Sequence, residues 1–315
     1  MKTAICTLYE GNYHYGVGAL INSLVANQFS GDVFVGYRGA LPPWLRQYHT
    51  TNLVGWKDAP FIKLSNGSTI YFLFLQTNIH FTNYKPQFLI DLTTGLCTNY
   101  DAIAYFDPDI VVCRHWEYFE DWMKYGVALV HESVTNDMPP THPLRRKWMN
   151  IAKEEGNEVH RQIHSYINGG FCGLLLSHLS FLHTWQKFID IGIQKYHAEN
   201  KNFMTHARPY PFRSLDQDAL NITAMVYEQE ISEVGPEAMG FVYGVVAMAH
   251  AVGRHKPWNK SFLYNSFFGN SPTFADKAFW NYANGEIKLY SKNYLSIKKF
   301  SMLASSFIGR FYKRN

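Results

Sequence analysis

The sequence has little cysteine, and none of it is paired in a CxxC motif or set at zinc-ligand spacing. Cys6, Cys97 and Cys172 have apolar neighbours, which indicates reduced thiols in a protein core. No apolar run reaches the length of a membrane span, and Met1 and Lys2 lead directly into a predicted strand without an apolar leader. We therefore expect a cytoplasmic protein without disulfides.

Acidic residues are missing from the last part of the chain. Residues 287–315 contain seven basic side chains and no acidic one, so the rest of the 315 residues carries a net charge of 4 − 7 = −3. A body with net negative charge argues against a nucleic-acid enzyme, which would spread positive charge over the folded domain. With 47% hydrophobic residues, the chain can bury one large core or two modest ones.

A third glycine is missing where a dinucleotide fingerprint needs it. Residues 3–8, 16–28 and 32–37 predict a strand, a helix and a strand, which make a βαβ unit of a parallel sheet. Ile21 stands where that fingerprint has its last glycine, so the NAD fingerprint is rejected. The loop 9–15 still lies at the carboxyl end of the first strand, where α/β sheets bind nucleotides.

Two carboxylates interrupt the most apolar part of the chain. Residues 102–105 and 110–112 predict buried strands, and Asp107, Pro108 and Asp109 form the turn between them. Pro108 fixes its own φ and biases Asp107 toward extended geometry, so the turn is stiff. A rigid pair of oxygen ligands there suits a divalent cation that holds a diphosphate, although a solvated Asp-Pro-Asp turn has the same sequence.

Two polar segments precede predicted buried elements. Asn168, Gly169 and Gly170 come just before a strand, where glycines let a ligand approach the backbone, although a plain turn explains them equally well. Residues 215–221 precede a helical pattern that runs through 225. The acidic residues of this segment can simply cap the helix, but they offer more acceptors than one cap needs.

A histidine and a lysine follow an apolar strand predicted over 241–248. His250 can supply a nitrogen ligand to Mn²⁺, and Lys256 can neutralise diphosphate oxygens; a satisfied histidine is the alternative. Lys85 stands just ahead of a helix predicted over 86–92, with Pro86 in its first turn. This lysine is either solvated or a second cation aimed at the same anion.

Taken together and in this order, these segments resemble glycosyltransferase family 8. The family pattern has a DxD at a strand end, an Asn-x-Gly element, an Asp-Gln-Asp-x-Leu-Asn stretch and a closing His-x-x-Gly-x-x-Lys-Pro-Trp, matched here at 107–109, 168–170, 216–221 and 250–258. The resemblance implies an α/β protein of GT-A fold, with a Rossmann-like, mostly parallel central sheet flanked by helices. Ala251 follows the histidine where an aromatic residue is usual, which leaves the donor sugar open.

The resemblance also implies an activity. A protein of this family would be a metal-dependent, retaining hexosyltransferase that moves galactose or glucose from a UDP-sugar to a saccharide acceptor. Such an enzyme would act in the synthesis of bacterial cell-surface polysaccharide or lipopolysaccharide. Two other classes fit the same residues: a metal-dependent sugar-nucleotide hydrolase, which needs no acceptor for turnover, and a non-catalytic nucleotide-sugar-binding protein, which shows no turnover.

The resemblance assigns roles residue by residue. The implied ligands of Mn²⁺ or Mg²⁺ are Asp107, Asp109 and His250. The implied contacts of the nucleotide and its diphosphate are Thr7, Tyr9, Asn12, Gly253 and Lys256. The implied contacts of the transferred sugar are Lys85, Asn168, Asp216 and Gln217. Gln217 would lie under the anomeric carbon, which favours front-face attack by the acceptor hydroxyl, with Asp218 as nucleophile if a covalent intermediate forms.

The basic tail has the spacing of an amphipathic helix. Its apolar residues are Ile297, Phe300, Leu303, Ala304, Phe307, Ile308 and Phe311, and its flanking basic residues are Lys298, Lys299, Arg310, Lys313 and Arg314. The helix can pack on the protein's own core, but the absence of acidic residues favours an anionic membrane surface. We expect a catalytic domain over 1–262 and a helical extension over 263–315 that holds the protein at the inner face of the cell membrane, near a lipid-linked saccharide acceptor. No nucleic-acid partner is expected.

Overall fold

A nine-stranded sheet forms the centre of the computed structural model, which describes residues 1–132, 137–204 and 211–311. Including two strands outside this sheet, the strands of the described ranges are β1 (Thr3–Glu10), β2 (Asp32–Arg38), β3 (His49–Leu53), β4 (Trp56–Lys63), β5 (Thr69–Phe74), β6 (Ala102–Phe106), β7 (Ile110–Val112), β8 (Val127–His131), β9 (Ile167–Leu175), β10 (Ile231–Val234) and β11 (Met248–His250). The order across the sheet is β10-β8-β9-β6-β1-β2-β5-β4-β3, and β7 and β11 form a separate antiparallel pair. All strands of the large sheet except β4 and β9 point the same way, so the predicted mostly parallel α/β class is confirmed.

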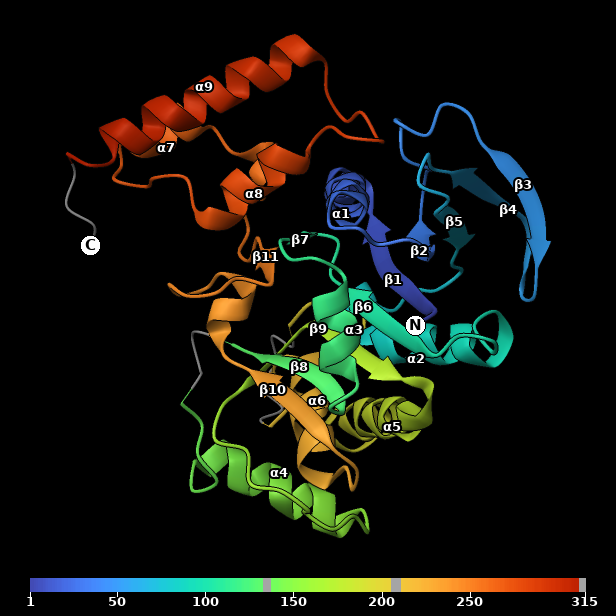
Figure 1. Cartoon of the computed structure of the whole chain (residues 1–315). Coiled ribbons are helices and arrows are strands. Elements are labelled where there is room, and N and C mark those ends of the chain that lie inside the picture. The colour runs from blue at the N-terminus through green and yellow to red at the C-terminus, as the bar shows by residue number, and fades with distance from the viewer. Residues whose placement is uncertain (133–136, 205–210, 312–315) are drawn as a thin grey trace.

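Helices cover both faces of this sheet (Figure 1). The helices of the described ranges are α1 (His14–Ala26), α2 (Phe81–Gly95), α3 (Glu117–Met123), α4 (Pro143–Glu154), α5 (Leu179–Tyr196), α6 (Leu215–Val226), α7 (Phe262–Ser266), α8 (Phe274–Tyr282) and α9 (Lys292–Ile308). One core cluster joins α2, α4, α5 and α6 to the sheet, and a second joins α1 and α3 to it. The predicted βαβ unit is present, because β1 and β2 pair in parallel and α1 connects them.

The helix around Pro86 is longer than the sequence predicted. It starts at Phe81, so Pro86 lies inside α2 and Lys85 is a helical, buried residue. The prediction assumed that proline marks the first turn, where its missing N–H costs nothing. The structure instead caps the helix with His80, whose Nδ1 accepts a hydrogen bond from the Thr82 backbone N–H at 3.3 Å.

The apolar segment before His250 is mostly not a strand. Gly240 adopts a φ of +70°, the segment after it bends, and only Met248–His250 pairs with β7. Val242 and Tyr243 are exposed, so their apolar character does not reflect a buried strand. The short pairing places His250 opposite Ile110, and the Ala251 N–H donates to the Asp109 carbonyl at 3.0 Å. This register brings the histidine next to the Asp-Pro-Asp turn.

The basic tail forms a helix, α9, over Lys292–Ile308. A third core cluster joins α7, α8 and α9 to β7 and β11 through residues that include Trp280, Met302, Val111 and Ala249. Within the described ranges, we find no helix with the length and apolar character needed to span a bilayer. Lys313 and Arg314 lie outside those ranges, and the boundary between residues 262 and 263 stays a prediction.

Candidate functional site

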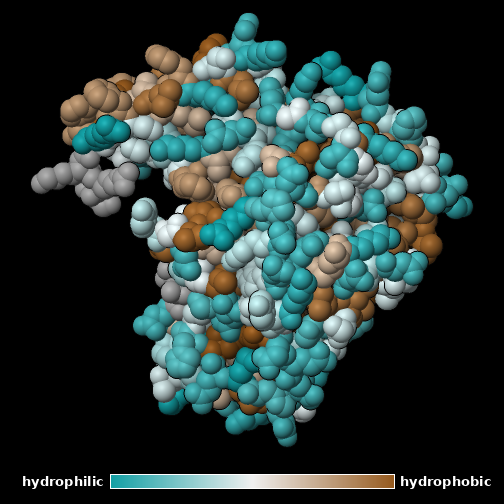
Figure 2. Space-filling model, viewed as in Figure 1, coloured by the Kyte–Doolittle hydropathy of each residue, from teal (hydrophilic) through white to brown (hydrophobic). Residues whose placement is uncertain are grey.

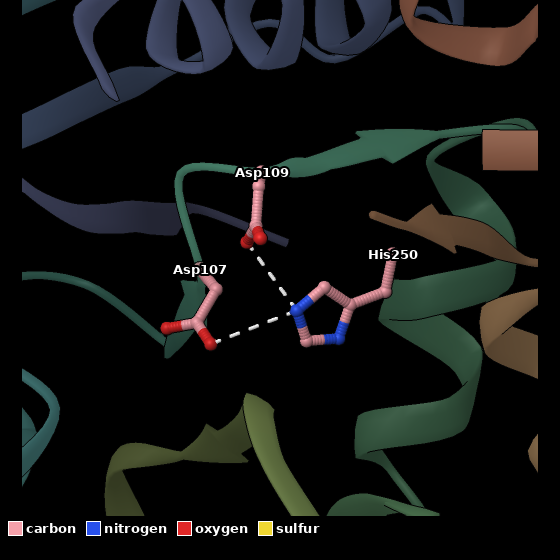
Figure 3. A group of neighbouring side chains, drawn as sticks. All are labelled: Asp107, Asp109 and His250. Atoms are coloured by element: carbon pink, nitrogen blue, oxygen red, sulfur yellow. Dashed lines mark ion pairs between the residues drawn. The ribbon is translucent and has the colours of Figure 1, made fainter. Parts of the chain in front are cut away.

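Two aspartates and a histidine from separate segments meet at one point (Figure 3). His250 Nε2 lies 3.3 Å from Asp109 Oδ1 and 3.8 Å from Asp107 Oδ2. One ligand atom from each of the three residues lies within 4.8 Å of the others. Two carboxylate oxygens and one imidazole nitrogen at this spacing fit a single hard divalent cation of the Mn²⁺ or Mg²⁺ type.

Two lysines hold the outer oxygens of these aspartates, which are the carboxylate oxygens that do not face His250. Lys256 Nζ lies 2.5 Å from Asp109 Oδ2, and Lys85 Nζ lies 3.0 Å from Asp107 Oδ1. Burial raises the pKa of Asp109, but His250 and Lys256 outweigh it and lower that pKa well below the ordinary range. The carboxylate is therefore ionised at neutral pH, with its other oxygen directed at His250.

Lys85 ties the aspartate turn to α6. Its ammonium group contacts the Gly169 carbonyl at 2.8 Å, Asp107 at 3.0 Å and Asp216 at 3.2 Å. Burial lowers the pKa of Lys85, but the two carboxylates outweigh it, so the pKa is raised. An ammonium group has three donors, and these three partners account for all of them.

The polar residues of β9 and α6 face the same cluster. Gln217 Oε1 accepts a hydrogen bond from the Gly169 N–H at 2.9 Å, and Asn168 Oδ1 accepts from the Gly170 N–H at 2.8 Å. The asparagine and the glycines lie inside β9, not before it as the sequence predicted. Gly170 is needed because the ring of His250 lies over it: a Cβ there would sit 2.5 Å from His250 Cε1.

Asp218 has a different environment from its neighbours. Its Oδ1 accepts from the Tyr166 hydroxyl at 2.7 Å, and its Oδ2 accepts from the backbone N–H groups of Arg213 and Ser214 at 2.8 and 2.9 Å. Oδ2 therefore fixes the segment that enters α6, whereas Oδ1 ties α6 to Tyr166, just ahead of β9; the N-cap residue Ser214 itself has no side-chain cap. Burial nevertheless raises the pKa of Asp218 to about 7.

This pKa predicts a pH-dependent effect of Asp218→Asn. A carboxyl whose pKa is about 7 in the folded state and about 3.9 in the unfolded state binds more protons when folded. Its contribution to stability is therefore lost as the pH rises from about 4 to 7. We expect the free energy of unfolding of Asp218→Asn, relative to wild type, to rise over this interval and level off above it. Urea unfolding at a series of pH values measures the difference, and a pH-independent difference contradicts the expectation.

The Asp-Pro-Asp turn rests on the first turn of α1. A Cβ added to Gly16 would lie 1.9 Å from the carbonyl oxygen of Pro108, so only glycine allows this approach. Gly16→Ala is expected to lower the free energy of unfolding by about 1–3 kcal/mol and to displace the turn. Gly95→Ala in α2 is the matched control, because its nearest neighbour is a Val54 methyl at an ordinary 3.5 Å. Urea unfolding of both variants tests the contact, and equal stabilities contradict it.

Within the described residues, no hydrogen bond or ion pair joins four of the predicted nucleotide contacts to this charged cluster. Thr7 is buried in β1 and its Oγ1 has no hydrogen-bond partner within the described chain, and the Tyr9 hydroxyl donates to the Ala40 carbonyl at 3.2 Å. Asn12 is exposed in a short 3₁₀ turn, and Gly253 has a φ of +91° in an exposed loop. Their roles stay predictions.

Two tyrosines lie near the aspartates; Tyr105 was not predicted as a site residue, and Tyr13 was predicted only as part of the loop 9–15. The Tyr105 hydroxyl donates to Asp107 Oδ1 at 2.9 Å, and the ring of Tyr13 lies 5.7 Å from Lys256 Nζ. Side chains two residues apart on a strand share a face, so the pairing of Tyr105 with Asp107 was available from the sequence. The sequence placed Tyr13 in the loop 9–15, but its contact with Lys256 depends on tertiary packing that no local pattern reveals.

Comparisons with known proteins identify the fold. No family model matches the sequence, and no curated protein matches it. Solved structures do match. The galactosyltransferase LgtC in complex with donor and acceptor sugar analogues is 14% identical, with a TM-score of 0.51; the match covers 93% of this chain and 99% of that one. An active-site mutant of LgtC is 13% identical, with a TM-score of 0.53; the match covers 92% of this chain and 98% of that one.

A third match extends beyond this chain. The bifunctional glycosyltransferase WbbM is 13% identical with a TM-score of 0.52; the match covers 94% of this chain but only 51% of WbbM, so this chain spans about half its length. The matched proteins are glycosyltransferases, and the GT-A fold that the sequence resemblance implied is confirmed.

Proposed function

We propose that this protein is a retaining glycosyltransferase of family 8 that transfers galactose or glucose from a UDP-sugar to a saccharide acceptor. The observation that carries the proposal is the convergence of Asp107, Asp109 and His250, with Lys85 and Lys256 on the outer carboxylate oxygens. The proposed setting is the synthesis of bacterial cell-surface polysaccharide or lipopolysaccharide.

The aspartates and the histidine would hold a Mn²⁺ or Mg²⁺ ion. When bound, such an ion supplies positive charge that stabilises the diphosphate leaving group. Lys256 lies beside Asp109. Burial lowers the pKa of Lys256, but Asp109 outweighs this effect and raises it, so the lysine stays charged at neutral pH. A fixed ammonium group there adds to the electrostatic stabilisation of the departing diphosphate.

Gln217 and Asp216 are the proposed contacts of the transferred sugar. The Gln217 side chain is oriented by the Gly169 N–H, and Asp216 is held by Lys85. Asp218 has both oxygens bound by Tyr166 and the backbone. This arrangement supports front-face attack by the acceptor hydroxyl over a covalent intermediate on Asp218.

A donor panel tests the proposal. The full chain is incubated with Mn²⁺ and a set of UDP- and GDP-sugars, and nucleotide release is measured with and without a lipid-linked oligosaccharide extract. We expect release from UDP-galactose or UDP-glucose that depends on the acceptor. Release that is independent of any acceptor identifies a hydrolase, and UDP binding without release identifies a binding protein; either result overturns the proposal.

A further inference from the structure

The outer face of α9 is apolar and exposed. The side chains of Ile297, Phe300, Leu303, Phe307 and Phe311 are 60–73% exposed. Hydrophobic side chains gather along this helix at the upper left of Figure 2. The four that lie within α9 fall in an arc of about 120° at 100° per residue. We call these five residues the α9 apolar face.

The opposite side of α9 makes the intramolecular contacts. Met302 and Ser305 are buried there, and Lys298 Nζ donates to the Lys260 carbonyl at 3.1 Å. The helix therefore packs through a narrow, partly polar side, while its apolar face points away from the protein. This is the reverse of the usual surface helix, whose apolar side faces the core.

Basic residues border this apolar face. Lys292, Lys299 and Arg310 are exposed, and on the helix Lys292 and Lys299 fall beside the apolar arc. No acidic residue occurs anywhere in 287–315, whereas the rest of the chain has a net charge of −3. The charge of the molecule is therefore strongly polarised toward the end that carries α9.

We propose that α9 docks this protein on an anionic lipid surface, with the α9 apolar face at the boundary between headgroups and acyl chains. Lys292, Lys299 and Arg310 would contact the headgroup phosphates. The polarised charge favours this occupant, because a second copy of the chain would bring two basic borders together while lipid phosphates neutralise them. The proposed location is the inner face of the cell membrane. The proposal does not depend on the sugar-transfer reaction.

Docking would also orient the candidate site. The third core cluster packs Met302 of α9 and Trp280 of α8 against Ala249, which precedes His250. Val111, two residues after Asp109, belongs to the same cluster. A lipid surface that binds α9 would therefore fix the orientation of the cluster that packs beside the candidate metal ligands. This part rests on the proposed function.

Vesicle co-sedimentation of the full chain tests the docking. We compare phosphatidylcholine vesicles with vesicles that contain about one third phosphatidylglycerol. Wild type is expected to sediment with the anionic vesicles and much less with the neutral ones. Phe300→Ser/Leu303→Ser/Phe307→Ser is expected to lower the partition coefficient at least about tenfold, because it removes three apolar side chains that the lipid would bury. Lys292→Gln/Lys299→Gln/Arg310→Gln is expected to remove the preference for anionic lipid.

The matched control is Val54→Ser/Tyr125→Ser, which removes two hydrophobic side chains that are 67% and 74% exposed elsewhere. Equal sedimentation of wild type and the Phe300→Ser/Leu303→Ser/Phe307→Ser triple variant overturns the proposal. So does a dimer in light scattering that the triple variant dissociates, because a second copy then covers the face. Sugar transfer to a soluble acceptor is measured in parallel. If the wild-type protein shows no transfer, the result counts against the proposed function and leaves the lipid result intact.

Discussion

Lys85→Met is expected to lower the free energy of unfolding by about 3–5 kcal/mol, the cost of leaving a buried charge without its partner. The Lys85 side chain is 2% exposed, and its ammonium group lies between Asp107 and Asp216. Methionine keeps the length of the side chain but removes the charge, so the Asp216 carboxylate stays buried and unpaired. Urea unfolding near neutral pH measures the loss.

The pH dependence of this variant separates charge from packing. Burial raises the pKa of Asp216 and Lys85 opposes that rise, so removing the lysine raises the pKa further. Stability lost through an unpaired carboxylate returns as the pH falls and the carboxylate is protonated. We therefore expect the deficit of Lys85→Met to shrink toward pH 4. A deficit that is the same at all pH values indicates a packing defect instead. Lys187→Met, at an exposed lysine, is the control and should leave stability nearly unchanged.

Asp107→Asn is expected to lower kcat/KM for sugar transfer by about 10²–10³-fold, the usual cost of losing one electrostatic contact to the reacting groups. The amide keeps the shape of the side chain, and its oxygen can still accept the Tyr105 hydrogen bond. It does not provide the negative charge that faces His250 Nε2 at 3.8 Å. Steady-state kinetics with the best donor from the panel give the ratio.

Two measurements keep this prediction open to contradiction. Mn²⁺ affinity in the presence of UDP should fall together with activity, because both depend on the same carboxylate. Asp121→Asn, at an exposed aspartate of α3 that pairs with Lys124, should change neither. If Asp107→Asn retains wild-type affinity and rate, Asp107 is not a ligand.

The local part of the site was predictable because its signal is local. An apolar run broken by Asp107 and Asp109 marks a turn after a buried strand, and the structure has β6 ending at Phe106 and β7 starting at Ile110. The acidic residues of 215–221 were expected ahead of a helix, and they lie in the first turn of a helix that begins at Leu215. In both places the hydrophobic pattern and the polar interruption indicate the same element.

Other features depended on tertiary contacts. Pro86 suggested a helix start, but burial of Phe81 and the cap by His80 extend α2 toward its N-terminus. The apolar residues after Gly240 suggested a strand, but only three residues find a partner, β7. Single-sequence patterns weigh propensity and periodicity, and here the packing of remote segments outweighed both.

The roles of single side chains were the hardest to infer. Lys85 was predicted as a contact of the sugar, and that role stays a prediction; within the chain its three donors are directed at Gly169, Asp107 and Asp216. Asp216 and Asp218 are two residues apart, yet one faces Lys85 and the other faces Tyr166. Neighbouring identical residues differ in this way because successive side chains of a helix point in directions about 100° apart.

The formal charges around His250 nearly cancel. Asp107, Asp109 and Asp216 contribute three negative charges, and Lys85 and Lys256 contribute two positive ones, so these five side chains sum to −3 + 2 = −1. A cluster with so small a net charge attracts a free divalent cation only weakly. The two negative charges of a UDP-sugar diphosphate cancel those of the cation, so the pair can enter without changing this sum. Ion and nucleotide are therefore expected to bind as one chelate, each raising the affinity for the other.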